Sequence, residues 1–453
     1  SSRGPTVRRC SSLTLSARRR RLLRPRPVRA MWGAAWAALQ IAAVAALDDG
    51  LGRTPPMGWR SWNLFGGNVN QGLMERIMEG MASKKRQVDG APTSLCDLGY
   101  CDVGLDDNWQ KCGAGSAGYQ YHDASGRPII NTASFPDMAA MTAKAHGLGL
   151  TAGWYLNNCI CSEGQEPTQS MYEQDVHFLT DVFGFDGVKL DGCGKQMDLD
   201  KWSKLINATG RKVVIENCHW GQTVPSADWC PWHFFRTSGD VTASYGSVVG
   251  NLQTTVPWAK QGLARPGCWS YPDMLEVGVS GLSIAEARSH FGAWCIVSSP
   301  LTLSHDVTND TVSDTVWPII SNREAIAVNQ AWAGHSGSPF KESDARVRLA
   351  DFTHVVGGVV TPHDGDSVPS FQYFHKPLGG GRVAVLMMNH GPTAQKLSLF
   401  QADVPNLACS VCHVRDVWNR KDLPPLEHDF AANVESHDSV FLVLSPMPTQ
   451  FQV

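Results

Sequence analysis

The chain has 453 residues, of which 43% are hydrophobic and 18% are charged. This length and composition predict a globular protein with one large domain and a smaller one. The formal net charge is −3 at pH 7, so no excess of positive charge points to a nucleic-acid partner, and we expect none.

We expect residues 1–46 to be a leader and signal peptide outside the folded domains. Residues 1–30 contain no Met and many Arg, which is typical of upstream or transit-like sequence. From Met31 to Ala46 the chain is apolar, rich in Ala and closed by small residues, a pattern that predicts a signal peptide. This stretch is too short to predict a membrane span, and no later stretch is long and apolar enough, so we expect none.

The cysteines and two sequons favour the secretory pathway. Of the thirteen cysteines, Cys10 lies in the leader, which leaves an even number for disulfides in an oxidising compartment. Tripeptides that start at Asn207 and Asn309 are N-glycosylation sequons. We therefore expect a disulfide-bonded glycoprotein that is extracellular, vacuolar or lysosomal.

Short apolar runs alternate with amphipathic segments of helical length from residue 47 to about residue 330. The expected strands are 100–105, 150–156, 187–190, 213–216 and 234–236, and the expected helices are 135–146, 170–183 and 199–207. This alternation predicts a parallel α/β sheet. No Gly-x-Gly-x-x-Gly turn follows the first strand, which disfavours a dinucleotide-binding fold.

Polar residues follow the C-terminal ends of five successive predicted strands. They are Asp106 and Asp107, Asn157 and Asn158, Asp191, Asn217 with His219 and Trp220, and Asp240. One such acid is usually a helix cap or a turn residue. Five in succession indicate a (β/α)8 barrel, or TIM barrel, whose loops converge on an active site at one face. We assign residues 47–335 to this barrel.

From residue 336 to residue 453 the pattern changes. The expected strands are 355–360, 370–375, 382–388, 396–400, 411–418 and 439–444, separated by Gly, Pro, Asn and Asp. No segment of helical length lies between them. This pattern predicts a C-terminal antiparallel β-sandwich domain.

Asp191 and Asp240 are the candidate catalytic pair. Hydrolysis of a glycosidic bond needs one carboxylate at the anomeric carbon and a second that donates a proton to the leaving oxygen. Lys189 points to the same side of its strand as Asp191 and would keep it ionised. Arg236 lies four residues before Asp240, and Gly239 allows a tight turn that brings both to the cleft. The alternative for Lys189 and Asp191 alone is a structural salt bridge.

Asp106 and Asp107, followed by Trp109, are candidate acceptors for sugar hydroxyls. The alternative for this pair alone is an Asx-turn that closes a loop. A metalloenzyme would show histidines at metal-ligand spacing, and the sequence has no His-Glu-x-x-His, so we expect no metal and no cofactor. Cys409 and Cys412 have no second ligand pair, which favours a hairpin disulfide.

Six ordered motifs carry a resemblance to the glycoside hydrolase family 27 α-galactosidases, or melibiases. They are residues 54–63, 105–109, 188–193, 272–275, 294–301 and 325–330, and the resemblance extends over nearly all of residues 47–453. The family fold is a (β/α)8 barrel followed by a β-sandwich. The resemblance implies a retaining α-galactosidase that removes terminal α-D-galactosyl residues from oligosaccharides or glycoconjugates by double displacement.

The resemblance also implies a role for each site residue. Asp191 resembles the nucleophile, Asp240 the acid and then the base, and Asp106 and Asp107 the acceptors of the galactose 4- and 6-hydroxyls. The other residues that match substrate-contacting positions are Trp62, Tyr155, Lys189, Cys218, Trp220, Arg236, Asp273 and Met274.

The loop at 217–220 decides the sugar 2-position in this family. Cys218 and Trp220 resemble the plant-type loop, which fills the space that α-N-acetylgalactosaminidases leave open for an acetamide. Galactose is therefore the expected sugar. The alternatives are an α-N-acetylgalactosaminidase, a β-L-arabinopyranosidase of the same family, and a sugar-binding protein that has lost catalysis.

The resemblance further implies two disulfides. Cys218 is expected to pair with Cys230, and Cys193 with Cys159 or Cys161. The chain departs from the family at Asn108, where a Cys is common, so Cys96, Cys101 and Cys112 are expected to form a local substitute. A second departure is the segment 269–273, which differs from the usual Trp-Asn-Asp before the Pro. A homodimer is among the oligomeric states that the sequence allows.

Overall fold

The computed structural model describes residues 47, 49–352, 354–356, 359–361 and 367–447. The expected leader and signal peptide at 1–46 lie outside these residues. Within the described part of the chain, none of the helices combines the length and the apolar character that crossing a bilayer requires.

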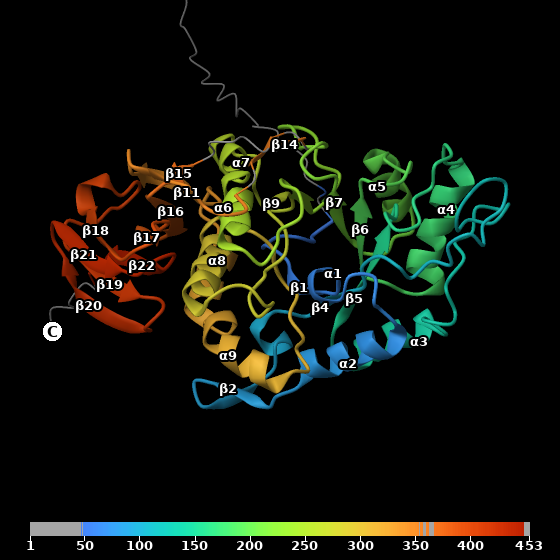
Figure 1. Ribbon diagram of the computed structural model, residues 1–453, viewed down its shortest axis with the longest axis horizontal. Helices are drawn as coiled ribbons and strands as arrows, with labels where there is room; N and C mark the ends of the chain where they lie inside the picture. Colours follow the sequence, from blue (N-terminus) through green and yellow to red (C-terminus); the bar gives the residue numbers. More distant parts are fainter. Residues whose placement is uncertain (1–46, 48, 353, 357–358, 362–366, 448–453) are drawn as a thin grey trace, which may run out of the picture. The chain divides into compact units, whose positions relative to one another are not determined.

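Eight parallel strands among the described residues form one curled sheet (Figure 1). These strands are β1 (Met57–Arg60), β4 (Asp102–Gly104), β5 (Thr151–Leu156), β6 (Gly187–Asp191), β7 (Val214–Cys218), β8 (Phe234–Arg236), β9 (Trp269–Tyr271) and β10 (Leu301–Leu303). Their order is β10-β1-β4-β5-β6-β7-β8-β9. A bridge from Leu275, which follows β9, to Leu303 in β10 joins the two edges and closes the sheet. The predicted barrel is therefore confirmed.

The sequence predicted five of these strands and missed β1, β9 and β10. Each of the three has only three or four residues and is almost wholly buried. Such a strand shows neither the length nor the alternation of apolar and polar residues from which a strand is predicted.

Helices connect the strands and lie outside the barrel (Figure 1). They are α1 (Trp62–Phe65), α2 (Gln71–Ala82), α3 (Met138–Gly147), α4 (Gln169–His177), α5 (Leu199–Ala208), α6 (Tyr245–Gln253), α7 (Val256–Lys260), α8 (Ile284–Ile296), α9 (Asp310–Ile320) and α10 (Arg323–Gln330). The three predicted helices are present, but the segment 170–183 continues from α4 into a π-helical turn at Phe178–Val182.

Most of these helices begin at a side chain that accepts a backbone N–H, which satisfies a donor that the helix leaves unpaired. The capping residues are Asn70, Asp137, Thr168, Asp198, Ser244, Ser283, Asn309 and Asn322. These caps fix where each βα loop ends, and the loops carry the polar residues that the sequence singles out.

The C-terminal part of the chain is antiparallel. Its strands are β11 (Ser338–Glu342), β12 (Arg346–Val347), β13 (His354–Val356), β14 (Val359–Thr361), β15 (Val368–Pro369), β16 (Phe371–Gly379), β17 (Arg382–Asn389), β18 (Gln395–Phe400), β19 (Cys412–Asp416), β20 (Lys421–Leu426), β21 (Asp429–Val434) and β22 (Ser439–Pro446). A six-stranded sheet has the order β11-β16-β17-β22-β19-β20, and β18 pairs with β21. Leu397 of β18 shares a core with Val385 and Leu442 of the larger sheet, so the two sheets form the predicted sandwich.

The predicted strand at 355–360 is corrected by the structure to two short strands, β13 and β14, which pair in antiparallel register. A further hairpin, which the sequence did not predict, joins β2 (Arg86–Val88) to β3 (Ala91–Thr93) near α2.

Strand β17 is buried on both faces, which explains how the sandwich is attached to the barrel. Val385 and Met387 point into the sandwich core, whereas the alternate residues Leu386 and Met388 belong to the core that contains Phe291 of α8. A strand that is covered on both sides reads as one continuous apolar run, as β17 does.

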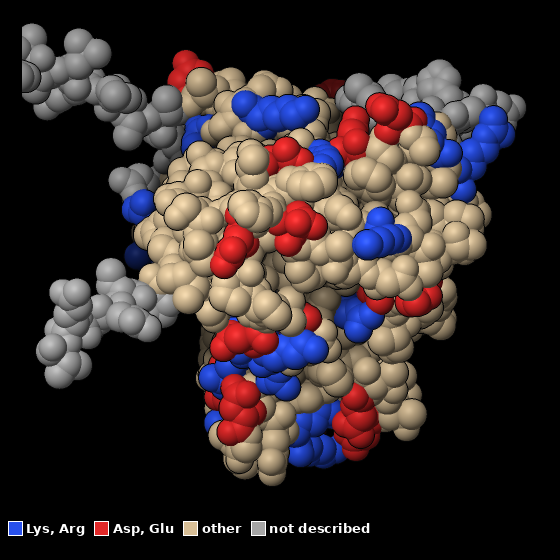
Figure 2. Space-filling view, turned by 90° about the vertical axis from the view of Figure 1, so that its left-hand side faces the viewer, with Lys and Arg blue, Asp and Glu red and all other residues tan. Residues whose placement is uncertain are grey.

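Figure 2 shows a face on which Lys and Arg side chains are interspersed with Asp and Glu side chains. Ion pairs on the surface of the chain include Lys341 with Asp403 at 2.8 Å and Arg420 with Asp89 at 3.2 Å. Exposed pairs of this kind contribute at most about 1 kcal/mol each to stability. The mixed charge agrees with the small net charge of the chain.

The predicted disulfide between Cys218 and Cys230 is wrong. Cys230 pairs with Cys268, and Cys218 is a free, buried thiol. The reason is the direction of the Cys218 side chain, which points from the end of β7 toward Arg236 inside the barrel, at 3.5 Å from a guanidinium nitrogen. Cys230 and Cys268 instead lie just before β8 and β9, which are neighbouring strands.

Four other disulfides join described cysteines. Cys193 pairs with Cys159, one of the two partners that the sequence left open, and the remaining pairs are Cys96–Cys101, Cys112–Cys161 and Cys409–Cys412. The bond between Cys159 and Cys193 ties the loop after β5 to the loop after β6.

Candidate active site

Polar side chains at the C-terminal ends of the barrel strands converge because the strands are in register. Tyr155 of β5 is opposite Lys189 of β6, which is opposite Glu216 of β7. Asp191 and Cys218 form a second pair, two residues further along. Since side chains at every second position share a face, these two layers both point into the barrel.

The carboxylate of Asp191 is buried and held by donors on both oxygens. Its Oδ2 accepts a hydrogen bond of 2.8 Å from the Tyr155 hydroxyl, and its Oδ1 accepts one of 2.7 Å from the backbone N–H of Gly192. Burial raises the pKa of Asp191 above its ordinary value, and the Lys189 ammonium and the Tyr155 hydrogen bond oppose this rise. The arrangement fixes the direction of the carboxylate.

The sequence assigned Lys189 as the ion partner of Asp191, and the structure places it closer to Asp106. The Lys189 ammonium donates to Asp106 Oδ2 at 2.9 Å and lies 3.7 Å from Asp191 Oδ2. Burial lowers the pKa of Lys189, but its carboxylate neighbours outweigh that effect and raise the pKa well above the ordinary value. Lys189 is thus a fixed positive charge between two carboxylates.

Asp107 braces the loop that follows β5. Its Oδ2 accepts the backbone N–H groups of Cys159 and Ile160 at 2.9 and 2.7 Å, and its Oδ1 accepts the side-chain amides of Gln110 and Asn158 at 2.8 and 3.1 Å. The backbone N–H of residue 108 is a fifth donor. A carboxylate offers about four acceptor sites, so the protein itself fills those of Asp107.

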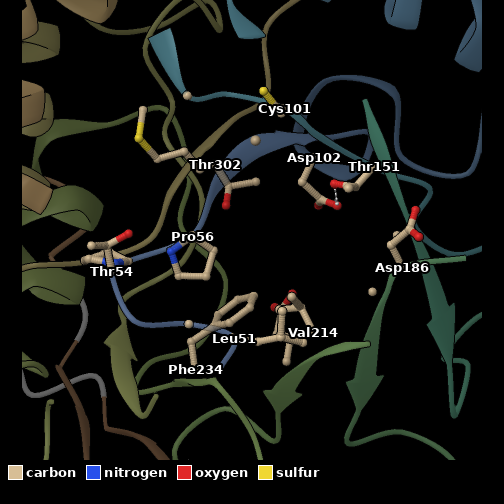
Figure 3. Close-up of a pocket in the computed structure, with 18 of the residues that line it drawn as sticks. Leu51, Thr54, Pro56, Cys101, Asp102, Thr151, Asp186, Val214, Phe234 and Thr302 are labelled. Atoms are coloured by element: carbon tan, nitrogen blue, oxygen red, sulfur yellow. Dashed lines mark hydrogen bonds between the residues drawn. The ribbon is translucent and has the colours of Figure 1, made fainter. Parts of the chain in front are cut away.

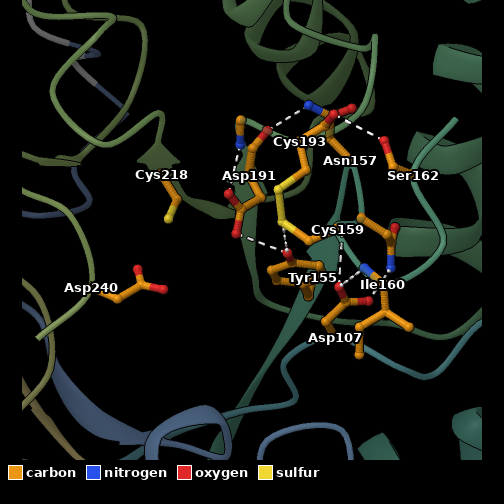
Figure 4. Close-up of a disulfide and its surroundings, with 12 residues drawn as sticks. Asp107, Tyr155, Asn157, Cys159, Ile160, Ser162, Asp191, Cys193, Cys218 and Asp240 are labelled. Atoms are coloured by element: carbon orange, nitrogen blue, oxygen red, sulfur yellow. Dashed lines mark hydrogen bonds between the residues drawn. A yellow bond between two sulfur atoms is a disulfide. The ribbon is translucent and has the colours of Figure 1, made fainter. Parts of the chain in front are cut away.

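Asp240 lies on the loop after β8 and is held by Arg236. One guanidinium nitrogen of Arg236 lies 3.0 Å from Asp240 Oδ1 and 3.0 Å from Asp273 Oδ2. Although 57% of the Asp240 side-chain surface is exposed, partial burial acts to raise its pKa, and the charges of Arg236 and Lys189 outweigh this and hold the pKa below its ordinary value. Figure 4 shows the carboxylates of Asp240 and Asp191 turned toward one shared space.

Asp273 has a structural role in this arrangement. It adopts a left-handed backbone conformation with φ of 87°, and its side chain accepts the backbone N–H of Val241 at 2.9 Å. The carboxylate therefore ties the segment after β9 to the loop that carries Asp240. A non-glycine residue in this conformation is strained, and the surrounding contacts must hold it there.

The remaining predicted residues, Trp62, Trp220 and Met274, pack against apolar and backbone neighbours. The Trp220 ring lies over Gly192, where an added Cβ would come within 3.5 Å of it. Trp62 and Met274 pack in one apolar cluster with Phe234, Trp269 and Tyr271. Trp62 is half-buried.

Sequence reasoning missed Arg60, Glu216 and the Gly192 amide as parts of the site. The Arg60 guanidinium lies 2.9 Å from Glu216 Oε2, and both side chains are buried. The available signal was Glu216, a charged residue in a predicted strand of apolar residues, since a buried charge needs a partner. Arg60 gave no such signal because β1 was not predicted as a strand.

A cavity of about 580 Å³ lies at the other end of the barrel (Figure 3). Its wall includes the first residues of six barrel strands, which are Met57, Asp102, Thr151, Gly187, Val214 and Phe234. Parallel strands run in one direction, so this is the N-terminal mouth of the barrel. It is opposite the strand ends that carry Asp191 and precede Asp240.

Cys159, Asp191 and Cys193 each place a potential ligand atom within 4.8 Å of the others. The two sulfurs are joined to each other, however, and a metal would need them as thiolates. The Tyr155 hydroxyl lies 3.2 Å from the Cys159 sulfur, so the disulfide packs directly against the residues that hold Asp191 (Figure 4).

A closed barrel followed by an antiparallel sandwich, with aspartates at the strand ends, agrees with the expected glycoside hydrolase. The family model described as Alpha galactosidase A matches residues 54–331, and the model described as Alpha galactosidase C-terminal beta sandwich domain matches residues 369–444. The chain belongs to the glycoside hydrolase family 27 α-galactosidases. The resemblance that its motifs predict is confirmed.

Relatives match over most of their length. The chain is 30% identical to an α-galactosidase of Coffea arabica over 410 residues, which cover 88% of this chain and 96% of that protein. It is 29% identical to an α-galactosidase of Oryza sativa subsp. japonica, with 91% and 90% covered. The structure of α-galactosidase I from Mortierella vinacea has 26% identity and a TM-score of 0.71, over 88% of this chain and 98% of that one.

Proposed function

We propose that the protein is a retaining α-galactosidase, which removes terminal α-D-galactosyl residues from oligosaccharides or glycoconjugates. The observation that carries this proposal is the placement of a buried carboxylate, Asp191, and a more exposed one, Asp240, around one space at the C-terminal end of the barrel (Figure 4). A retaining glycosidase needs a nucleophile and an acid/base in such a pair. Family membership supports the same reaction.

In the proposed first step, an oxygen of Asp191 attacks the anomeric carbon. The bond from that carbon to the leaving oxygen breaks, and Asp240 gives its proton to the leaving oxygen. In the second step, Asp240 accepts a proton from water, the water oxygen attacks the same carbon, and Asp191 leaves as a carboxylate. Two inversions at one carbon give net retention.

The donors around Asp191 support its assignment as the nucleophile. The Tyr155 hydroxyl and the Gly192 amide hold the two carboxylate oxygens, so the group does not have to be oriented during the reaction. Its raised pKa makes the ionised form a stronger base and a better nucleophile, at the expense of activity at low pH.

The contact with Arg236 has consequences for Asp240. The first step needs protonated Asp240, and the lowered pKa of this carboxyl makes its protonated fraction small except at acid pH. The ionised form that Arg236 stabilises is the base of the second step. We therefore propose an optimum on the acid side of neutrality, as an acidic vacuole, lysosome or extracellular space would supply.

Asp106 and Lys189 are the proposed partners of the galactose 4- and 6-hydroxyls. They form one buried ion pair at the C-terminal end of the barrel, and a hydroxyl can both donate to the carboxylate and accept from the ammonium. Asp107 would accept a hydroxyl only if the amide of Gln110 or Asn158 moved away. Trp62 is the proposed wall against which the sugar ring packs.

Cys218 and Trp220 are the proposed reason for galactose specificity. Cys218 is completely buried beside Arg236, and the Trp220 ring covers Gly192. We propose that the Cys218 thiol and the Trp220 ring together leave less room for a 2-acetamido group than two smaller side chains would. An α-N-acetylgalactosaminidase and a β-L-arabinopyranosidase are the alternatives that the assay below separates.

The test is a panel of aryl glycosides assayed on the wild type and on Asp191→Asn. We expect the wild type to cleave the α-galactoside faster than the α-N-acetylgalactosaminide and the β-L-arabinopyranoside. The variant should lose at least about 10³-fold in kcat while folding normally, because an amide does not attack the anomeric carbon. Full activity of Asp191→Asn, or a preference for another sugar, would contradict the proposal.

We also propose the domain limits 47–335 and 336–453, passage through the secretory pathway, and glycans at Asn207 and Asn309. The support for the first is that α10 ends at Gln330 and β11 starts at Ser338. The five disulfides support an oxidising compartment, and the two Asn side chains are exposed. A homodimer stays a prediction.

A further inference from the structure

A buried row of alternating charges, formed by Glu216, Arg60, Asp106 and Lys189, leads to Asp191 inside the barrel. Arg60 lies 2.9 Å from Glu216 and 4.0 Å from Asp106, and Lys189 lies 2.9 Å from Asp106 and 3.7 Å from Asp191. None of the five side chains is more than 7% exposed. Two cations therefore lie among three carboxylates, and Arg60 and Glu216 also line the cavity at the N-terminal mouth of the barrel.

The far end of this row is the pair of Arg60 and Glu216, which the proposed chemistry does not use. Arg60 ends β1, and Glu216 lies in β7, across the barrel from it in the sheet order. Gly104 leaves space for the guanidinium, since an added Cβ there would come within 3.0 Å of Arg60 Nε. Among the described residues, Nε and Nη1 of Arg60 have no hydrogen-bond partner.

A pair of this kind adds little to stability. The loss of hydration for two buried charges roughly offsets their attraction, and an apolar pair of similar volume is often at least as stable. Its incomplete hydrogen bonding makes the balance less favourable still. The position of the pair, 4.0 Å from the carboxylate that Lys189 holds, points instead to an effect on the site.

We propose that Arg60 and Glu216 are positioning residues that keep Lys189 on Asp106 and thereby set the ionisation of Asp191. This inference rests on the proposed role of Asp191 as the nucleophile. The carboxylate of Glu216 neutralises the charge of Arg60, so Lys189 is the main cationic partner of Asp106. This contact keeps the Lys189 ammonium 3.7 Å from Asp191. Arg60 thus acts on Asp191 through Asp106 and Lys189, whereas Glu216 also faces Lys189 directly from the neighbouring strand.

The two members of the pair act with opposite sign. Without the charge of Glu216, Arg60 is free to bind Asp106, Lys189 can move toward Asp191, and ionised Asp191 is favoured. Without Arg60, the charge of Glu216 is uncompensated, Lys189 is shared among three carboxylates, and ionised Asp191 is disfavoured. The other groups that face Asp191 are Tyr155, Cys218, Asp240 and the Gly192 amide, which these variants leave in place.

The experiment measures kcat/KM for an aryl α-galactoside as a function of pH in Glu216→Gln, Arg60→Met and the double variant Arg60→Met/Glu216→Met. The acid limb of this profile, where kcat/KM falls as the pH is lowered, reports the ionisation of the nucleophile in the free enzyme. We expect it to move by about one pH unit to lower pH in Glu216→Gln and by about one pH unit to higher pH in Arg60→Met, as for a unit charge removed at about 10 Å. In the double variant it should return to within a few tenths of the wild-type value.

If the pair had only a structural role, both single variants would lose activity or stability. The acid limbs of their pH profiles would then not move in opposite directions. Arg60→Lys keeps the positive charge, so the acid limb should stay at its wild-type pH. This variant also provides a test if Arg60→Met does not fold. The matched control is Arg415→Met with Glu324→Gln, a pair at 2.8 Å between the sandwich and α10, whose removal should leave the limb unmoved.

Shifts in the same direction, or none in either single variant, would overturn the inference. The outcome is separable from a failure of the proposed function. If Asp191→Asn keeps full activity, the nucleophile assignment fails. If Asp191→Asn is inactive and the limb does not move, only the role of Arg60 and Glu216 fails.

Discussion

The hydroxyl of Tyr155 donates a hydrogen bond of 2.8 Å to Oδ2 of Asp191, the carboxylate at the end of the neighbouring strand. The same hydroxyl lies 3.2 Å from the sulfur of Cys159, whose disulfide with Cys193 joins the two loops above these strands. The Tyr155 hydroxyl thus connects the proposed nucleophile to the disulfide that joins these loops.

Removal of the Tyr155 hydroxyl should slow the reaction without weakening binding. A hydrogen bond to a charged group contributes about 1.5–3 kcal/mol, so Tyr155→Phe should lower kcat by about 10- to 100-fold with a smaller change in KM. The acid limb of kcat/KM should move to higher pH because the lost bond favoured ionised Asp191. The control is Tyr100→Phe, whose buried hydroxyl donates to the Ile320 carbonyl at 2.9 Å. Equal effects of the two changes would contradict this account.

Opening the Cys159–Cys193 disulfide should affect both stability and turnover. The two cysteines are 34 residues apart, for which loop entropy predicts about 4 kcal/mol of stabilisation. Cys159→Ser/Cys193→Ser should therefore lower the free energy of unfolding by up to this amount and reduce kcat. The matched control is Cys409→Ser/Cys412→Ser, which opens a bond between cysteines three residues apart and should cost less than about 2 kcal/mol. Unchanged kcat in the first variant would argue against a brace on Asp191.

His122 should make the protein sensitive to alkali. Its ring is fully buried between Glu163 at 2.9 Å and Asp175 at 3.1 Å. Burial acts to lower the pKa of His122, but the two carboxylates outweigh it and raise the pKa to about 9 from the ordinary 6.5. The stabilisation from the charged ring is therefore complete below pH 6.5 and is lost as the pH rises through about 9.

Thermal unfolding between pH 6 and pH 10 measures this effect. The wild type should lose stability over the upper part of this range, by an amount on the order of 3 kcal/mol. His122→Gln should be less stable at pH 6 and should lose less on going to pH 10. If the stability of His122→Gln falls with rising pH as steeply as that of the wild type, groups other than His122 cause the loss of stability at alkaline pH.

Substitution of Asp240 should make the rate depend on the leaving group. Without a general acid, Asp240→Ala should cleave an α-galactoside with a poor leaving group at least about 10³-fold more slowly, and one with an activated aryl leaving group much less so in the first step. Added azide should restore turnover and give α-galactosyl azide, because Asp191 still forms the covalent intermediate. A uniform loss over all leaving groups would indicate that Asp240 only positions Arg236.

The sequence predicted the part of this architecture that depends on repeated patterns. The alternation of strands and helices predicted a parallel α/β sheet, and polar residues at five strand ends predicted a barrel and its active face. Three short buried strands were not predicted, because a run such as Trp269–Tyr271 is too short to show a periodicity. Such a run forms a strand because it pairs with neighbouring strands. The alternation of apolar and polar residues, together with the turn residues, predicted the sandwich. These patterns did not predict that the sandwich attaches to the barrel through β17, which is buried on both faces.

The sequence predicted the residues of the candidate site better than the contacts between them. Cys218 was assigned to a disulfide by resemblance to a family pair, whereas its side chain points into the barrel and Cys230 pairs with Cys268. Lys189 pairs with Asp106, which is 83 residues away in sequence, and Arg60 pairs with Glu216 across the barrel. Such pairings depend on register and closure of the sheet, which no local pattern contains.

The most direct test of the proposed double displacement is the configuration of the first product. Proton NMR during hydrolysis of an aryl α-galactoside distinguishes the α and β anomers of galactose before they interconvert. The account predicts that the α anomer appears first and the β anomer later, by mutarotation. First formation of the β anomer would mean a single inversion, and it would contradict a covalent intermediate on Asp191.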